Sequence, residues 1–269
     1  MSLVPFLKWP GGKRWFVAHH AQVFPSTYGR YFEPFLGGAS VFFHLQPNRA
    51  VLSDCNAELI DVYRAIARRR RQVEALLSEH HNAHGYRYYY RIRGTIPADL
   101  AARAARTLYL NRTCFNGIYR VNLSGTFNVP KGEKSTVLLD TDDFRAAASV
   151  LRRAEIVCND FEPMINRARG GDLVFADPPY TVRHNNNGFV KYNETLFSWT
   201  DQQRLAKALM RAAVRGVKVV LTNADHDEVR ALYPQRTFSA RVVERYSSIS
   251  CTTSSRRSYR ELVIRANCD

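Results

Sequence analysis

The stretch Asp172-Leu173-Val174-Phe175-Ala176-Asp177-Pro178-Pro179-Tyr180 joins a short apolar run to a tetrapeptide that cannot extend it. The run from Leu173 to Ala176 predicts a short buried strand. Two successive prolines cannot continue a helix or a central strand, so the backbone is fixed directly after the run. Open α/β sheets keep their binding sites at the carboxyl ends of their strands. The stretch therefore predicts an α/β sheet with a site at the end of this strand.

Asp177-Pro178-Pro179-Tyr180 offers the groups that would receive a planar ring carrying an amino group. The Asp177 carboxylate and the Pro178 carbonyl can accept the two amino hydrogens, and Tyr180 supplies an aromatic face for stacking. The alternative is structural: the tetrapeptide makes a turn after the strand and the tyrosine fills the core. Both interpretations place Asp177 at a strand end, and only the first predicts chemistry there.

Short apolar runs alternate with longer helical patterns on both sides of this stretch, as in α/β folds. Further strands are predicted at 31–34, 50–54, 155–158 and 216–222, and helices from residue 41, at 59–67 and at 202–214. The helical pattern at 59–67 is expected to end in the run Arg68–Arg71, which is interpreted as solvent-exposed. The stretches 240–246 and 259–265 alternate like an antiparallel hairpin with a polar tip.

Residues 57–150 differ from the rest of the chain, because they are rich in Arg, Tyr, Asn and Ala and hold few β-branched runs. Such a stretch is too long for a loop within a compact domain. We therefore predict an inserted, mostly helical subdomain. It divides the chain into a first part of the main domain at 1–56, the insertion at 57–150 and a second part at 151–269.

The charge of the chain is strongly unbalanced: 39 basic against 24 acidic residues give a net charge of +15 over 269 residues. In a soluble protein this excess favours a polyanionic partner, most simply nucleic acid. No run approaches the roughly 18 apolar residues of a membrane span, and the N-terminus lacks an apolar core of signal-peptide length. The five cysteines are scattered singly, which argues against a zinc cluster or a disulfide framework. We expect a cytoplasmic protein with no metal.

Five motifs in a fixed order narrow the interpretation further: Lys8–Lys13, Glu33–Ser40, Ser53–Asn56 with Glu58–Ile60, Leu110–Arg112 through Phe127–Pro130, and Asp177–Tyr180. In this order the sequence resembles the Dam-type DNA adenine N6-methyltransferases, which form the D12 class or α-group. The resemblance covers essentially the whole chain, with Pro10 departing from the usual alanine. It implies a Rossmann-like S-adenosylmethionine-dependent methyltransferase sheet with a target-recognition domain inserted at 57–150.

The resemblance also implies which residues bind the adenine and the cofactor, S-adenosyl-L-methionine. The catalytic residues would be Asp177, Pro178 and Tyr180. The cofactor residues would be Trp9, Lys13, Glu33, Pro34, Phe35, Gly37, Gly38, Ser40, Asp54, Asp160, Phe161 and Asp177. Taken alone, Gly37 and Gly38 allow a tight turn that a ligand can approach, or they form an ordinary glycine turn. Asp54, at the next strand end, could take ribose hydroxyls or cap the following helix.

The segment 111–122 interleaves arginines, amides and aromatic rings, which is chemistry suited to reading bases. Arginine can pair bidentately with guanine and asparagine with adenine. The resemblance implies DNA contacts for Lys8, Phe115, Asn116, Ile118, Arg120, Asn122 and Pro130. Phe115 stands where the family wedges a ring into the base stack, although by itself a core position explains it better. Arg256 and Arg257, in the polar tip of the hairpin, are candidates for phosphate contacts.

The function expected from these observations is methylation at N6 of an adenine flipped out of duplex DNA, in GATC or a longer site that contains GAT. Three alternatives stay open: methylation at N4 of cytosine, methylation of an amide in protein or RNA, and a DNA-binding regulator that has lost catalysis. Asp177 favours adenine, and the basic insertion favours DNA. A monomer is the simplest state, and a companion restriction endonuclease is the partner that similar sequences suggest.

Overall fold

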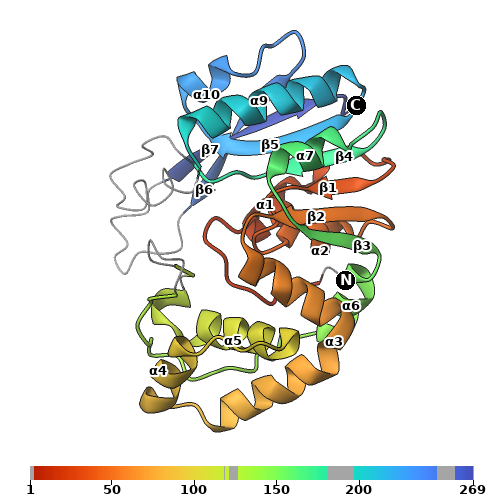
Figure 1. The fold of residues 1–269 in the computed structure, drawn as a ribbon. Helices are drawn as coiled ribbons and strands as arrows, with labels where there is room; N and C mark the ends of the chain where they lie inside the picture. Colours follow the sequence, from red (N-terminus) through yellow and green to blue (C-terminus); the bar gives the residue numbers. More distant parts are fainter. Residues whose placement is uncertain (1–2, 118, 121–126, 181–196, 247–257, 269) are drawn as a thin grey trace. The chain divides into compact units, whose positions relative to one another are not determined.

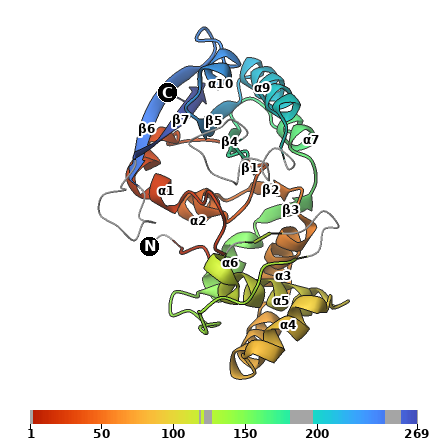
Figure 2. The ribbon, with the colours of Figure 1, turned by 90° about the vertical axis from the view of Figure 1, so that its left-hand side faces the viewer.

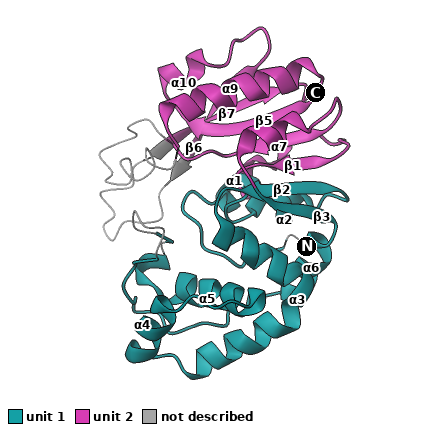
Figure 3. Ribbon diagram, in the orientation of Figure 1, with its two compact units in different colours: residues 1–17, 36–158 teal, residues 18–35, 159–269 magenta. Residues whose placement is uncertain are grey.

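The structure is a computed structural model that describes residues 3–117, 119–120, 127–180, 197–246 and 258–268. The chain forms two compact units (Figure 3). The first unit spans Met1–Val17 and Leu36–Cys158, and the second spans Ala18–Phe35 and Asn159–Asp269. The helix α1 (Arg14–His20) contains the first boundary between them.

The second unit holds the strand that precedes Asp177. Its strands are β1 (Tyr31–Glu33), β4 (Leu173–Ala176), β5 (Lys218–Ala224), β6 (Ser239–Tyr246) and β7 (Ser258–Ala266). They follow the order β1-β4-β5-β7-β6. β4 is parallel to both of its neighbours and all four of its residues are buried, as expected for a strand covered on both faces.

The helices of the second unit are η1 (Ala21–Val23), α7 (Phe161–Asn166), α9 (Trp199–Val214) and α10 (Asp227–Ala231). α7 and α9 cover one face of β4 and β5 (Figure 1). α9 begins three residues before the predicted start, because Ser198 and Asp201 form a reciprocal capping box. The predicted hairpin is confirmed: β6 and β7 pair antiparallel, and β7 also pairs antiparallel with β5.

The first unit holds a parallel pair of strands and most of the helices. The strands are β2 (Ala50–Asp54) and β3 (Ala154–Cys158). The helices are α2 (Ser40–Leu45), α3 (Ala57–Asn82), α4 (Tyr86–Gly94), α5 (Leu100–Thr113), η2 (Phe115–Gly117) and α6 (Phe144–Leu151). α3, α4 and α5 lie side by side in Figure 1 and Figure 2. The predicted α/β class is thereby confirmed, and the boundaries of a recognition insertion stay a prediction.

The expectation that the helix after β2 ends at the arginine run is confirmed in part, because α3 is kinked inside this run and then continues. α3 continues through Arg68–Arg71 to Asn82, with non-helical dihedral angles only at Arg69 (φ −132°, ψ 30°). Arginine is a good helix former, so helical structure resumes directly after the break at Arg69. Val73 and Leu77, which are fully buried, continue the apolar face beyond the run.

Candidate active site and nucleic-acid interface

Asp177 is held by a hydroxyl from the neighbouring strand. The parallel register pairs Ala176 of β4 with Leu221 of β5, which brings Asp177 beside Thr222. The buried Thr222 hydroxyl donates a 2.6 Å hydrogen bond to Asp177 Oδ1. A bond to a charged acceptor is among the stronger hydrogen bonds, and it fixes the rotation of the carboxylate.

The rest of the tetrapeptide is held by buried polar side chains. Gln202 Nε2 donates a long 3.5 Å bond to the Pro179 carbonyl, and Gln202 Oε1 accepts a 3.0 Å bond from Asn223 Nδ2. The Tyr180 hydroxyl donates to Glu261 Oε2 at 3.0 Å. Within the described part of the chain the Pro178 carbonyl has no protein donor. The turn therefore holds a carboxylate by a hydrogen bond and leaves a carbonyl oxygen that can accept another, while the predicted role of these two groups stays a prediction.

In the first unit, a hydrogen bond joins Gly37 to Asp54, and Gly37 lies against the ring of Trp9. The Gly37 N–H donates to Asp54 Oδ2 at 3.1 Å, and the Asn56 N–H donates to Asp54 Oδ1 at 3.0 Å. Gly37 has φ +45°, and a Cβ there would lie 2.8 Å from Trp9 Cδ1. Both the backbone conformation and the close contact with Trp9 therefore favour glycine at this position. A Cβ on Gly38 would lie 3.3 Å from Trp9 Cβ. The structure thus brings together four of the predicted cofactor residues.

Asp54 does not cap the helix that follows it. The cap of α3 is Asn56, whose Oδ1 accepts a 3.0 Å bond from the Leu59 N–H. Burial raises the pKa of Asp54, and the backbone donors at Asn56 and Gly37 oppose that rise. The backbone and the side chain of Cys55 also hydrogen-bond this carboxylate and oppose the rise of its pKa. The capping alternative is therefore wrong, and the ligand alternative is compatible with the geometry.

Two more predicted cofactor residues of the first unit are buried. Lys13 is 4% exposed and its Nζ donates to the Gly11 carbonyl at 3.1 Å. Ser40 begins α2 directly after Ala39, whose backbone is left-handed (φ 54°). Both side chains are therefore fixed within the fold of this unit.

The second unit holds the remaining predicted cofactor residues, and two of them, Phe35 and Phe161, belong to an aromatic cluster. The Phe35 ring stacks on Phe161 at 5.3 Å between centroids, and both rings contact Phe197. Glu33 is buried and accepts a 2.8 Å bond from the Tyr31 hydroxyl, which raises the Tyr31 pKa further after burial. Pro34, next in the chain, is also buried.

The Oδ1 atom of Asp160 accepts from two protein groups. Asp160 caps α7 through a 2.9 Å bond from the Glu162 N–H, and its Oδ1 also pairs with Arg204 at 2.9 Å. The Arg204 guanidinium lies 4.8 Å from the centre of the Phe161 ring. Any ligand contact at Asp160 therefore shares the carboxylate with Arg204.

Phe115 is exposed, so the core interpretation of this residue is wrong. It is 53% exposed and stands on the short helix η2, next to Asn116, which has a left-handed backbone (φ 55°). The Phe115 N–H donates to the Pro130 carbonyl at 2.9 Å, and the Gly132 N–H donates to Thr113 at 2.8 Å. A close backbone pairing thus holds the ring outward.

The other predicted DNA-contacting residues that the structure describes are also at the surface. Lys8, Asn116, Arg120 and Pro130 are exposed, and Arg120 Nε donates to Asn128 Oδ1 at 3.2 Å. Burial and then the charge of Lys134 lower the pKa of Lys8. Ile118, Asn122, Arg256 and Arg257 lie outside the described residues, so their predicted contacts stay predictions.

Asn111 and Arg112, by contrast, do not read bases, although the segment 111–122 suggested it. Asn111 is fully buried and exchanges two hydrogen bonds with the Lys8 backbone, at 2.9 and 2.7 Å. Arg112 is 1% exposed, and it bonds Phe6, Val137 and Asp142, which all belong to the first unit. Both residues are structural, and Asn111 acts by positioning Lys8.

A strand-end carboxylate and carbonyl that can receive an amino group, and an exposed basic and aromatic segment, are compatible with an amino-group methyltransferase that acts on nucleic acid. The comparison with protein families agrees. The chain belongs to the D12 class N6 adenine-specific DNA methyltransferases, whose family model matches residues 9–249.

Individual relatives carry matching names. The chain is 34% identical to the type II methyltransferase M1.LlaDCHI of Lactococcus lactis subsp. cremoris, over 98% of this chain and 95% of the relative. It is 34% identical to the DNA N-6-adenine-methyltransferase of Escherichia phage P1, over 91% of this chain and 33% of that longer protein. It is 32% identical to the DNA adenine methylase of Serratia marcescens, over 85% and 86% of the two chains.

None of the described helices is both long and apolar enough to cross a membrane. No group of three or more His, Cys, Asp or Glu side chains in the described ranges is arranged to hold a metal ion.

Replacing Thr222 by valine is expected to lower kcat for adenine methylation about 10-fold with little change in KM, because a reacting group displaced by about 1 Å can cost up to ~10² in rate. Thr222 is a positioning residue that acts through Asp177. Thr222→Ser keeps the hydroxyl and should recover most of the rate. Steady-state methylation of duplex DNA measures both, and a valine variant as fast as wild type would contradict the role.

Proposed function

We propose that this DNA adenine methyltransferase takes its methyl group from S-adenosyl-L-methionine and transfers it to N6 of an adenine flipped out of duplex DNA. The observation that carries the proposal is the rigid acceptor pair formed by the Asp177 carboxylate and the Pro178 carbonyl. An adenine inside the helix cannot reach such a buried turn, so the base must leave the stack.

The residues of both units fit the proposed cofactor chemically. A Cβ on Gly37 would fill the space beside Trp9, which leaves a backbone surface that a ligand can approach closely. The buried Asp54 carboxylate suits ribose hydroxyls, and the stacked pair Phe35 and Phe161 suits a flat base. Lys13, Glu33, Pro34, Gly38, Ser40 and Asp160 complete the proposed set. When bound, S-adenosylmethionine supplies an electrophilic methyl group on a sulfonium.

The chain's own residues account for the activation of N6. Asp177 Oδ and the Pro178 carbonyl accept the two N6 hydrogens, which turns the nitrogen lone pair toward the methyl donor. The negative carboxylate stabilises the positive charge that grows on N6 as the new N–C bond forms and the sulfur–methyl bond breaks, which would leave S-adenosyl-L-homocysteine. N6 then loses one of its hydrogens as a proton, which restores its neutral charge. Thr222 holds the carboxylate in place, and Glu261 holds the Tyr180 ring against which the adenine stacks. No protein nucleophile is required.

Recognition of the site is assigned to residues 57–150, together with Lys8 and the polar tip at Arg256 and Arg257. Phe115, exposed on its turn, would fill the gap left by the flipped base. Arg120, Asn122, Ile118, Pro130 and Asn116 would contact base edges or the backbone beside them. We propose GATC, or a longer site that contains GAT, as the target.

The proposal also covers the state in which the protein acts. A single copy suffices, because one site can methylate the two strands in turn. A companion restriction endonuclease is proposed as a partner in the cell, on the ground that the Lactococcus relative is named a type II methyltransferase.

Nucleoside analysis by mass spectrometry tests the reaction. Unmethylated duplex DNA is incubated with the protein and S-adenosylmethionine, digested, and analysed for modified nucleosides. N6-methyladenine is the expected product. N4-methylcytosine would overturn the choice of base, and the absence of any methylated nucleoside would overturn the activity proposed for this chain.

Substituting Arg120 by alanine is expected to relax discrimination at one guanine of the target. A good bidentate pair between arginine and guanine contributes about 1–3 kcal/mol, which corresponds to roughly 5- to 150-fold in preference. Comparing kcat/KM on duplexes that differ at each position of the site gives the profile. A profile identical to that of the wild type would remove Arg120 from the readers, and Arg87→Ala, at another exposed arginine of the same segment, is the matched control.

A further inference from the structure

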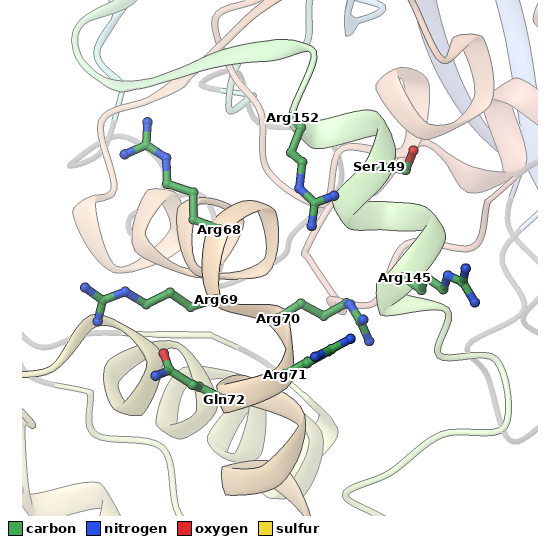
Figure 4. A pocket seen from close by; sticks show the side chains of 8 residues that line it. All are labelled: Arg68, Arg69, Arg70, Arg71, Gln72, Arg145, Ser149 and Arg152. Atoms are coloured by element: carbon green, nitrogen blue, oxygen red, sulfur yellow. The ribbon is translucent and has the colours of Figure 1, made fainter.

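The first unit carries an arginine-lined cleft that the methylation reaction does not use. The cleft has a volume of about 890 Å³ and lies between α3 and α6 (Figure 4). It is lined by Arg68–Arg71, Gln72, Arg145, Ser149 and Arg152. No carboxylate and no aromatic ring belongs to this lining among the described residues.

The kink in α3 shapes this cleft. In a regular helix successive side chains point about 100° apart, so four consecutive arginines would fan out around the axis. The break at Arg69 changes the direction of the chain within the run. Arg152 joins the end of α6 to this region by a 3.0 Å bond from Nε to the Ala67 carbonyl. Figure 4 shows Arg70, Arg71 and Arg152 directed toward the space between the two helices.

Most of the positive charge in the cleft is not compensated. Arg69 pairs with Asp99 at 2.8 Å and Arg70 with Glu74 at 2.7 Å. Arg68, Arg71 and Arg145 have no ion pair in the described part of the chain, and Arg152 bonds only a backbone carbonyl there. In the second unit, by contrast, Arg204 alone contacts three carboxylates. Guanidinium groups gathered without counter-charges create a positive potential that attracts anions.

The chemistry of the lining selects the kind of anion. Arginine, glutamine and serine side chains donate to phosphate oxygens, and arginine does so bidentately. A nucleotide base would have no ring to stack on, so a free nucleotide gains little over its phosphates. The family to which the chain belongs acts on DNA, which is a long polyanion. Successive phosphates of DNA can contact several arginines on two helices at once.

We propose that this cleft binds the phosphate backbone of DNA outside the sequence that is methylated. None of the lining residues is among those proposed to contact bases, and along α3 Arg68 lies eleven residues beyond Ala57, or about 17 Å from the end that follows Asp54. The cleft adds affinity without sequence information, because phosphate contacts hold the protein on DNA but do not read bases. The proposal rests on DNA as the substrate.

The test is the salt dependence of binding to duplex DNA that lacks GAT, measured without cofactor. The variant Arg68→Gln/Arg71→Gln/Arg145→Gln removes three charges that form no ion pair within the described residues, so the fold should be kept. Each lost phosphate contact lowers the slope of log K against log salt by about 0.9, so we expect a loss of roughly 2 to 3. The kcat on saturating target duplex should stay that of the wild type.

A matched control separates the cleft from net charge. Arg49→Gln/Arg169→Gln/Arg236→Gln removes the same charge from exposed positions outside the cleft. The proposal expects a clearly smaller change of slope in this control, and an equal change in both variants overturns it. It is overturned too if the cleft variant loses binding of inorganic triphosphate while DNA binding is unchanged. Because no methylation is measured in the binding assay, these outcomes are independent of the proposed reaction.

Discussion

Replacing Asp177 by alanine is expected to lower kcat for adenine methylation by about 10³-fold or more. The carboxylate is proposed to do two things at once: it accepts an N6 hydrogen, and it offsets the positive charge that grows on N6. Losing one preorganised electrostatic partner typically costs about 10²–10³ in rate, and the loss of orientation adds to it. Methyl incorporation under single-turnover conditions, with DNA and cofactor saturating, measures the effect on the chemical step.

Two further variants separate the charge of Asp177 from its geometry. Asp177→Asn keeps an oxygen that can accept from the Thr222 hydroxyl but removes the negative charge, so its rate should lie between those of alanine and wild type. Asp140→Ala removes an exposed carboxylate outside the site and should leave the rate unchanged. If Asp177→Ala methylates as fast as the wild type, the acceptor pair is not the catalytic centre.

The place of Asp177 directly after a strand could be predicted from the sequence because it depends on local rules. A short apolar run followed by two prolines predicts a strand that ends at Asp177, and β4 ends at Ala176. Thr222 could not be found in this way. Its contact with Asp177 depends on the register between β4 and β5, which are 45 positions apart at this point, and no local pattern encodes such a pairing.

The residues that follow Phe115 in the sequence, Asn116 and Gly117, indicate a turn that would place the ring at the surface. Asn116 and Gly117 both adopt positive φ, at 55° and 66°, and an Asn-Gly pair is a strong indication of a turn. A ring at the start of a tight turn is commonly at the surface, where the structure places it. What closes the turn is long-range: the bridge between Cys114 and Lys131 and the bond from Phe115 to Pro130.

Arg112 shows the opposite failure, in which a residue that looks functional is structural. Arginine beside asparagine in a basic region suggests base readout, yet this guanidinium is almost completely buried. Its acceptors are Phe6, 106 positions before it, and Val137 and Asp142, 25 and 30 positions after it. Helical periodicity does not distinguish a buried arginine with partners this distant from an exposed one.

Removing either partner of the Arg112–Asp142 pair is therefore expected to destabilise the first unit strongly. The two carboxylate oxygens of Asp142 accept 2.7 Å bonds from the two terminal nitrogens of Arg112, which also donate to the Val137 and Phe6 carbonyls. Asp142→Ala leaves a buried cation without its counter-charge, and breaking a buried pair in this way costs about 3–5 kcal/mol. Denaturant unfolding, monitored by circular dichroism, gives the change in free energy.

The double variant decides whether the charge pair itself or its burial dominates. Arg112→Met also strands the Phe6 and Val137 carbonyls, and each unsatisfied buried group costs about 1–3 kcal/mol, so this single variant should be at least as unstable as Asp142→Ala. Arg112→Met/Asp142→Leu leaves no unpaired charge, and replacing a buried pair by apolar side chains of similar volume is often close to neutral. We therefore expect the double variant to lose less stability than the sum of the singles by at least about 1–2 kcal/mol, within the range measured for contacting residues. Strict additivity would show that the two groups do not interact in solution.

The same pair should also affect DNA binding, although it contacts no base. Arg112 and Asn111 follow one another on α5, and both bond the N-terminal segment, at Phe6 and Lys8. Loss of the pair should therefore weaken DNA binding through Lys8, without any base contact being removed.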